Sequence, residues 1–117
     1  MKKHIQHGDV NLHPIDKLPD GLIKIDHNGV FVVALGELTG HCHRVITKEK
    51  ENLEIFQDEK GRYYFSVKGK TEIEHYNTIS KTKAEHDTLP LEIGVNYSVD
   101  FEEDYNPFTE LISRTQD

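Results

Sequence analysis

The fold is decided by the stretch from residue 30 to residue 47, which reads VFVVALGELTGHCHRVIT. Its first part, residues 30–38, is rich in β-branched and aromatic residues and predicts a strand. Gly36 and Gly40 mark a bend, after which residues 41–47 predict a second strand. The stretch therefore predicts two consecutive strands of a β domain.

Turn signals divide the rest of the chain into further short strands. Asp58-Glu59-Lys60-Gly61 has the composition of a hairpin turn, with glycine in the left-handed position. Leu89, Leu91 and Ile93 follow a period of two, and the same period resumes after Gly94. The strands predicted outside the central stretch are residues 22–25, 53–57, 62–67, 71–76, 89–93 and 95–101.

The two ends of the chain carry different signals. Pro14 and Pro19 disfavour helix, so residues 7–19 are expected to wrap the domain as a short extended segment followed by a loop. Asn106-Pro107 can cap and start a short helix over residues 108–114. Together the patterns predict an all-β, mostly antiparallel fold, a small barrel or sandwich with a short C-terminal helix.

Length and charge narrow the class of protein. The 117 residues suffice for a single domain, residues 1–117. The formal net charge of -7, with scattered Lys and Arg, makes a nucleic-acid polymer an unfavourable partner. No apolar run approaches the roughly 20 residues of a membrane-spanning helix, and no secretory signal opens the sequence, so a cytoplasmic location is expected. Cys42 is the only cysteine, which excludes an intrachain disulfide and a cysteine zinc finger.

Eight histidines are the main compositional oddity, and two of them lie two residues apart in the central stretch. In a strand, His41 and His43 project to the same face, about 6 to 7 Å apart, while Cys42 and Arg44 point the other way. Two imidazoles placed in this way can chelate one divalent cation. His41 and His43 are therefore the first candidate metal ligands.

Further candidates are predicted at strand ends. His75 ends one predicted strand and His86 precedes another, and functional groups often occupy such positions. Glu37, four residues before His41, can complete a coordination set or orient an imidazole. Arg44 is a candidate for binding an anionic ligand, although strand alternation points it away from the histidine pair. The competing interpretation is that these histidines are solvated loop residues or structural ones.

Three classes of function are compatible with this pattern. A facial set of imidazoles and carboxylates suits zinc, iron, manganese, nickel or copper, and an open coordination position permits hydrolysis or oxygen chemistry. Without metal, two facing histidines can act as general acid and base on a small phosphodiester. The third class is a non-catalytic structural or inhibitory module whose histidines stabilise turns and a homo-oligomer interface. The pattern alone does not decide between an enzyme and a protein that binds a small molecule or metal.

The chain resembles short bacterial and phage proteins of uncharacterised function. The resemblance is carried by Gly8-Asp9-Val10, by the segment from Thr39 to Arg44, and by Glu85-His86 followed by Leu89, Leu91, Gly94 and Tyr97. It implies no assigned activity. Separately, the glycine-flanked His-x-His is similar to the metal motif of the cupins, where a glutamate follows the pair and a later strand supplies another histidine. In this sequence Glu49 and Glu51 follow the pair within a charged run, and His75 or His86 can supply the later imidazole.

Overall fold

The computed structural model describes residues 3–35, 41–77, 82–83 and 88–101. Short strands dominate this part of the chain, and its one helical element is the 3₁₀ turn η1, Lys50–Asn52. The strands are β1 (Ile5–His7), β2 (Val10–Ile15), β3 (Ile23–Ile25), β4 (Val30–Leu35), β5 (His41–Thr47), β6 (Leu53–Gln57), β7 (Tyr63–Val67), β8 (Thr71–Asn77), β9 (Thr82–Lys83), β10 (Leu89–Pro90) and β11 (Asn96–Phe101).

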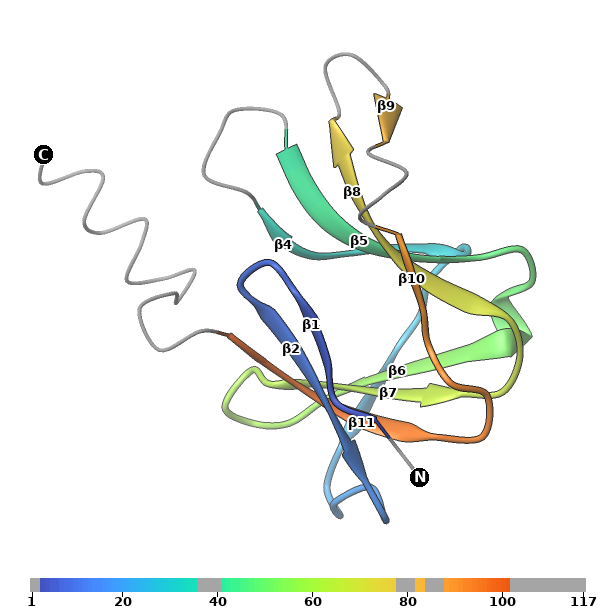
Figure 1. Cartoon of the computed structure of the whole chain (residues 1–117). Coiled ribbons are helices and arrows are strands. Elements are labelled where there is room, and N and C mark those ends of the chain that lie inside the picture. The colour runs from blue at the N-terminus through green and yellow to red at the C-terminus, as the bar shows by residue number, and fades with distance from the viewer. Residues whose placement is uncertain (1–2, 36–40, 78–81, 84–87, 102–117) are drawn as a thin grey trace, which may run out of the picture.

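The strands form two antiparallel sheets packed as a small sandwich (Figure 1). The first sheet has the order β1-β2-β11-β7-β6-β3, and the second has the order β10-β8-β5-β4, with β9 also paired to β8. Because the two sheets are separate, the fold is the sandwich of the two predicted architectures and not a closed barrel. The predicted all-β, mostly antiparallel class is confirmed.

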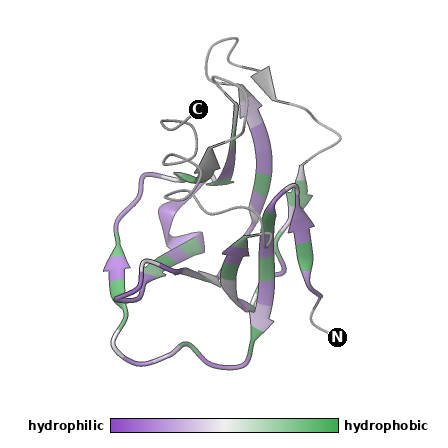
Figure 2. Cartoon of the chain, turned by 90° about the vertical axis from the view of Figure 1, so that its left-hand side faces the viewer, coloured by the Kyte–Doolittle hydropathy of each residue, from purple (hydrophilic) through white to green (hydrophobic). Residues whose placement is uncertain are grey.

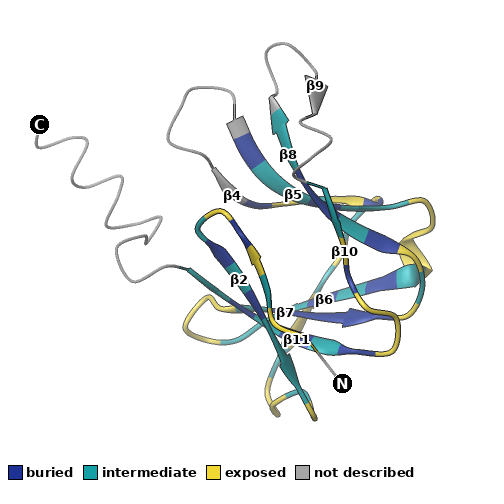
Figure 3. Ribbon diagram, viewed as in Figure 1, coloured by how far each residue is buried: buried dark blue, intermediate teal, exposed yellow. Residues whose placement is uncertain are grey.

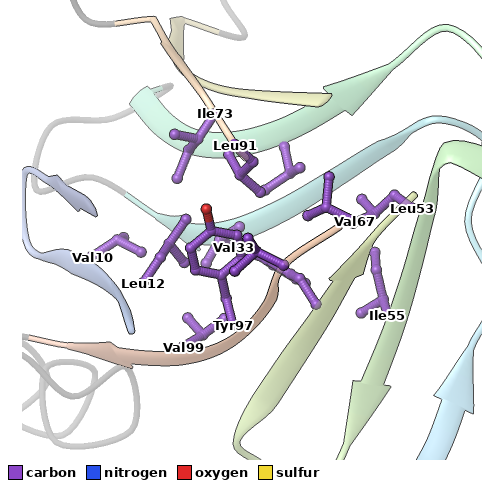
Figure 4. Close-up of a cluster of buried hydrophobic side chains, with 13 residues drawn as sticks. Val10, Leu12, Val33, Leu53, Ile55, Val67, Ile73, Leu91, Tyr97 and Val99 are labelled. Carbon is purple, nitrogen blue, oxygen red and sulfur yellow. The ribbon is translucent and has the colours of Figure 1, made fainter. Parts of the chain in front are cut away.

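The core lies between the sheets. Buried and less buried residues alternate along β2, β6 and β11. Hydrophilic and hydrophobic segments accordingly alternate along the ribbon (Figure 2), and buried positions recur along the strands (Figure 3). Figure 4 shows Val10, Leu12 and Tyr97 of the first sheet packed with Ile73 of the second. Tyr97 is fully buried, and its hydroxyl accepts a hydrogen bond of 3.0 Å from the Glu92 N–H. This satisfies the polar end of a large core side chain.

Strands with strong local signals have the predicted bounds. β5 and β6 match their predicted ranges residue for residue, and β7 and β8 differ from prediction by one residue at one end. The hairpin between β6 and β7 forms as expected, with Gly61 at a φ of +91° and the Asp58 N–H bonded to the Arg62 carbonyl at 3.0 Å. Local turn chemistry and alternation were sufficient here.

Two expectations were wrong. The N-terminal arm is not an extended segment followed by a loop: β1 and β2 form a hairpin across Gly8-Asp9, and β2 continues through Pro14. Proline is tolerated there because β1 pairs with β2 only as far as Leu12, so Pro14 has a single strand neighbour in the described chain, β11. The predicted strand over residues 89–93 is cut to two residues, because a turn with Gly94 at a φ of +87° connects to β11.

The predicted C-terminal helix over residues 108–114 lies outside the described residues. Within the part that is described, the chain contains no helix with the length and apolar character needed to span a membrane.

Candidate functional site

His43 and His75 lie opposite each other on neighbouring strands of the second sheet. They are register partners in the β5–β8 ladder, next to the fully buried partners Val45 and Ile73. Residues two apart in a strand share a face, so both imidazoles lie on the core side of the sheet. Their rings stack, with centroids 5.2 Å apart and planes inclined by 9°.

His7 brings a third imidazole to this point from the first sheet. It is the register partner of Val10, which is fully buried, so its side chain lies on the inner face, and His7 itself is only 4% exposed. Its Nδ1 atom is 2.8 Å from the Nδ1 atom of His43, with ring centroids 4.9 Å apart and planes nearly perpendicular. We call the three rings His7, His43 and His75 the imidazole row.

A hydrogen bond joins the first two rings of the row. Neutral imidazole has one N–H donor and one bare acceptor nitrogen. A distance of 2.8 Å between the Nδ1 atoms of His7 and His43 therefore means that one Nδ1–H donates and the other Nδ1 accepts. This hydrogen bond joins the first sheet to the second.

Gly8 permits this close approach. The residue has a φ of +61°, which L side chains rarely adopt, and a Cβ atom placed on it would lie 2.7 Å from Cε1 of His43. The turn after β1 thus packs its backbone directly on the His43 ring. Any side chain at residue 8 would displace the ring or the turn.

Arg44 lies on the opposite face of β5 and has partners there. Its Nε atom donates to Oε1 of Glu74 at 2.5 Å, and its guanidinium carbon lies 3.5 Å from the centre of the Tyr76 ring. Glu74 is 1% exposed and the Arg44 side chain 23% exposed. Arg44 therefore holds a buried carboxylate and does not reach the imidazole row.

Cys42, on the same face as Arg44, is also buried. Burial raises the pKa of its thiol, and the charge of Glu74 acts in the same direction while that of Arg44 opposes it. A thiol kept protonated in this way is a poor nucleophile, and it lies across the sheet from the histidines.

The predicted site residues thus have different outcomes. His43 and His75 lie together, whereas Arg44 lies on the other face. His41 begins β5 as the register partner of Asn77, but its side chain falls outside the description, and so do Glu37 and His86 altogether.

His7 is not among the candidate ligands named from the sequence, yet its Nδ1 atom lies 2.8 Å from that of His43. The sequence did contain a usable signal. Gly8-Asp9 is a two-residue turn, and around it Ile5 and His7 alternate in phase with Val10 and Leu12. Interpreted as a hairpin, this pattern places His7 on the inner face.

The arrangement offers imidazole nitrogens from both sheets at a partly buried position. As it stands, no three His, Cys, Asp or Glu side chains among the described residues converge as ligands of one ion. The chemistry directly available from the described rings is hydrogen bonding, proton transfer and, after a small adjustment, coordination by nitrogen.

Comparison with known proteins gives a family but no activity. A family described as a domain of unknown function (DUF8820) matches residues 6–101. No curated protein and no solved structure matches the chain.

Proposed function

Because the chain belongs to the DUF8820 family, whose function is unknown, we propose a function from the geometry of the site: the protein binds a divalent cation through histidine side chains centred on His43. The observation that carries the proposal is the meeting of His43 with two further imidazoles, His75 and His7. Imidazole is the commonest protein ligand for zinc, nickel, copper and iron. Packing of the apolar core alone would not require three imidazole rings in successive contact.

The proposed ligand set includes residues from the same end of β5 and β8. His41 precedes His43 by two residues on β5, and in this proposal its imidazole joins those of His43 and His75. His86 and Glu37 are the further ligands that the sequence pattern suggests. With three or four protein ligands, zinc would retain the tetrahedral geometry typical of its sites, and an open position would allow metal-assisted hydrolysis.

A second function is favoured by one specific contact, the hydrogen bond between His7 and His43. In such a neutral pair, the imidazole that donates its Nδ1–H keeps a bare Nε2 and can act as a general base, while the imidazole that accepts at Nδ1 carries its proton on Nε2 and can act as a general acid. In this alternative the protein binds a small polar ligand and hydrolyses a small phosphodiester without metal. The remaining alternative, a non-catalytic phage-type structural or inhibitory module, requires neither metal nor proton transfer at these rings.

Elemental analysis of protein purified without an affinity tag distinguishes these proposals. We expect zinc or nickel near one equivalent in the wild type and its loss in the double variant His41→Ala, His43→Ala. The matched control is the double variant His4→Ala, His13→Ala, which removes another stacked histidine pair, with ring centroids 4.6 Å apart, from the first sheet. That control should keep its metal.

Other results would favour one of the two alternative functions. A wild type without metal, and with no change in thermal stability on addition of zinc or nickel, contradicts cation binding. If that protein cleaves cyclic or linear nucleotides in the presence of a chelator, and the His41/His43 double variant does not, the metal-free hydrolase is supported. Absence of both properties leaves the non-catalytic module.

A further inference from the structure

We infer that His7 is a ligand of the proposed cation and that the cation bridges the two sheets, bound by the Nδ1 atoms of His7 and His43. This inference rests on the proposed function. The key observation is the distance of 2.8 Å between these two nitrogens, which come from β1 and β5.

The distance between the two nitrogens is compatible with replacement of the hydrogen-bonding proton by a metal ion. Two nitrogens bound tetrahedrally to zinc, each about 2.0–2.1 Å from the ion, are separated by about 3.3 Å. The Nδ1 atoms of His7 and His43 face each other 2.8 Å apart. To bind one ion, they must separate by about half an ångström, and both rings must turn so that each Nδ1 points at the ion and not at the other nitrogen.

The third ring determines how the site can be completed. His75 stacks on His43 from the neighbouring strand, and the β5–β8 ladder fixes its position. Because the two ring planes are inclined by only 9°, the His75 ring would have to turn out of the stack before one of its nitrogens could bind the same ion. After that change the proposed site would have one ligand from the first sheet and two from the second.

The turn at Gly8 restricts the position of the His43 ring. Its backbone packs on the His43 ring, so closely that a Cβ atom at residue 8 would approach Cε1 and Nε2 of that ring to 2.7 and 3.1 Å. This close packing restricts movement of the His43 ring and leaves Nδ1 as the nitrogen facing His7. An all-nitrogen set of this kind selects zinc, nickel, copper or cobalt over magnesium and calcium, which prefer oxygen ligands.

A cation bound by both sheets would stabilise the β1–β2 hairpin, which a cation bound within one sheet would not do. β1 is a three-residue strand at the edge of the first sheet, paired only with β2 in the described chain. Such an element opens easily by local unfolding. A cation that links His7 to His43 would hold the β1–β2 hairpin against β5, so amide hydrogen exchange should slow in both segments together.

The test uses zinc(II) and three proteins: the wild type, His7→Phe and His13→Ala. Phenylalanine keeps a ring at the buried position but removes both nitrogens, and His13 is a histidine of the same hairpin outside the imidazole row. We expect His7→Phe to bind zinc at least about tenfold more weakly than wild type, as for loss of a metal-site interaction, while His13→Ala binds it unchanged. In wild type, ¹⁵N spectra of the imidazoles should move the Nδ1 signals of His7 and His43 on zinc addition, and exchange should slow over residues 5–12 and 41–45.

These measurements distinguish failure of cation binding from failure of the His7–His43 bridge. If neither zinc nor nickel changes any of these signals in wild type, the proposed function fails and the inference with it. If wild type binds zinc but the His7 signals do not move and the hairpin exchanges at the same rate, this inference is overturned while the proposed function stands. The wild-type spectra decide this even if His7→Phe does not fold.

Discussion

The β5–β8 ladder changes character over a distance of two residues. At one rung Val45 faces Ile73, and both side chains are fully buried in the core. At the next inward-facing rung His43 faces His75, and both are half-buried. The same strand alternation places all four side chains on the inner face.

We infer from this difference that the two rungs have different roles, one in stability and one in binding. The Val45–Ile73 rung is closed by apolar side chains of the first sheet, whereas the His43–His75 rung meets His7 at the tip of the β1–β2 hairpin. At the His43–His75 rung, imidazole nitrogens that can bind a ligand or transfer a proton occupy the place of buried apolar side chains. We therefore expect substitutions at the first rung to affect mainly folding, and substitutions at the second to affect mainly binding.

The largest expected effect comes from the apolar rung. Ile73→Ala removes a fully buried side chain and should lower the free energy of unfolding by about 2–5 kcal/mol, through lost burial and the cavity left behind. Urea denaturation at neutral pH measures this change. A loss below that from His75→Ala would contradict the division between the two rungs.

An intermediate effect is expected at the hairpin turn that meets the imidazoles. Gly8→Ala forces an L side chain into a φ of +61° and a Cβ atom to 2.7 Å from the His43 ring, which should destabilise the fold by about 1–3 kcal/mol. Gly21→Ala provides a control, since Gly21 has a φ of +80° but nothing lies within 4 Å of the added Cβ atom. A larger effect on zinc affinity from Gly8→Ala than from Gly21→Ala would link the turn to the site, and equal effects would remove that link.

His75→Ala should have a smaller effect on stability. The side chain is half-buried and its ring stacks on His43, so its loss should cost about 0.5–1.5 kcal/mol, the range of an aromatic pair. Zinc titration of the folded variant should, by contrast, show clearly weakened binding. Unchanged affinity would exclude His75 from the ligand set.

The smallest effect is expected from the opposite face of β5, at alkaline pH. Because burial raises the pKa of the Cys42 thiol above its ordinary value in the folded protein, the unfolded chain loses this proton first. Stability from this group is therefore intact below about pH 8.5, the ordinary cysteine pKa, and declines above it. The wild type should lose stability more steeply than Cys42→Ala between about pH 8.5 and 10, measured by urea denaturation. Parallel curves would show that the thiol is not desolvated.

The sequence predicted those parts of the fold that depend on local patterns. Residues 41–47 and 53–57 alternate clearly between turn signals, and both strands have the predicted bounds. The β1–β2 hairpin was missed because the prolines in residues 7–19 were given more weight than the Gly8-Asp9 turn. Pro14 lies in a strand because only β11 pairs with β2 at that position in the described chain, and that pairing is not visible in a local pattern.

The candidate site was predictable only in part, for a related reason. Alternation placed His43 on one face of a strand, but its contact with His75 depends on the register of β5 with β8. Its contact with His7, 36 residues away, depends on packing between the sheets. Neither register nor sheet packing follows from residue spacing, so the sequence indicated which side chains carry chemistry without indicating which of them meet.

Anomalous diffraction from crystals grown with zinc would locate the proposed cation. We expect a zinc peak within about 2.0–2.1 Å of a ring nitrogen of His43, with His7 and His75 among its other ligands. Crystals grown with excess zinc that show no peak at His43, or a peak only at the His4–His13 pair, would contradict cation binding by His43.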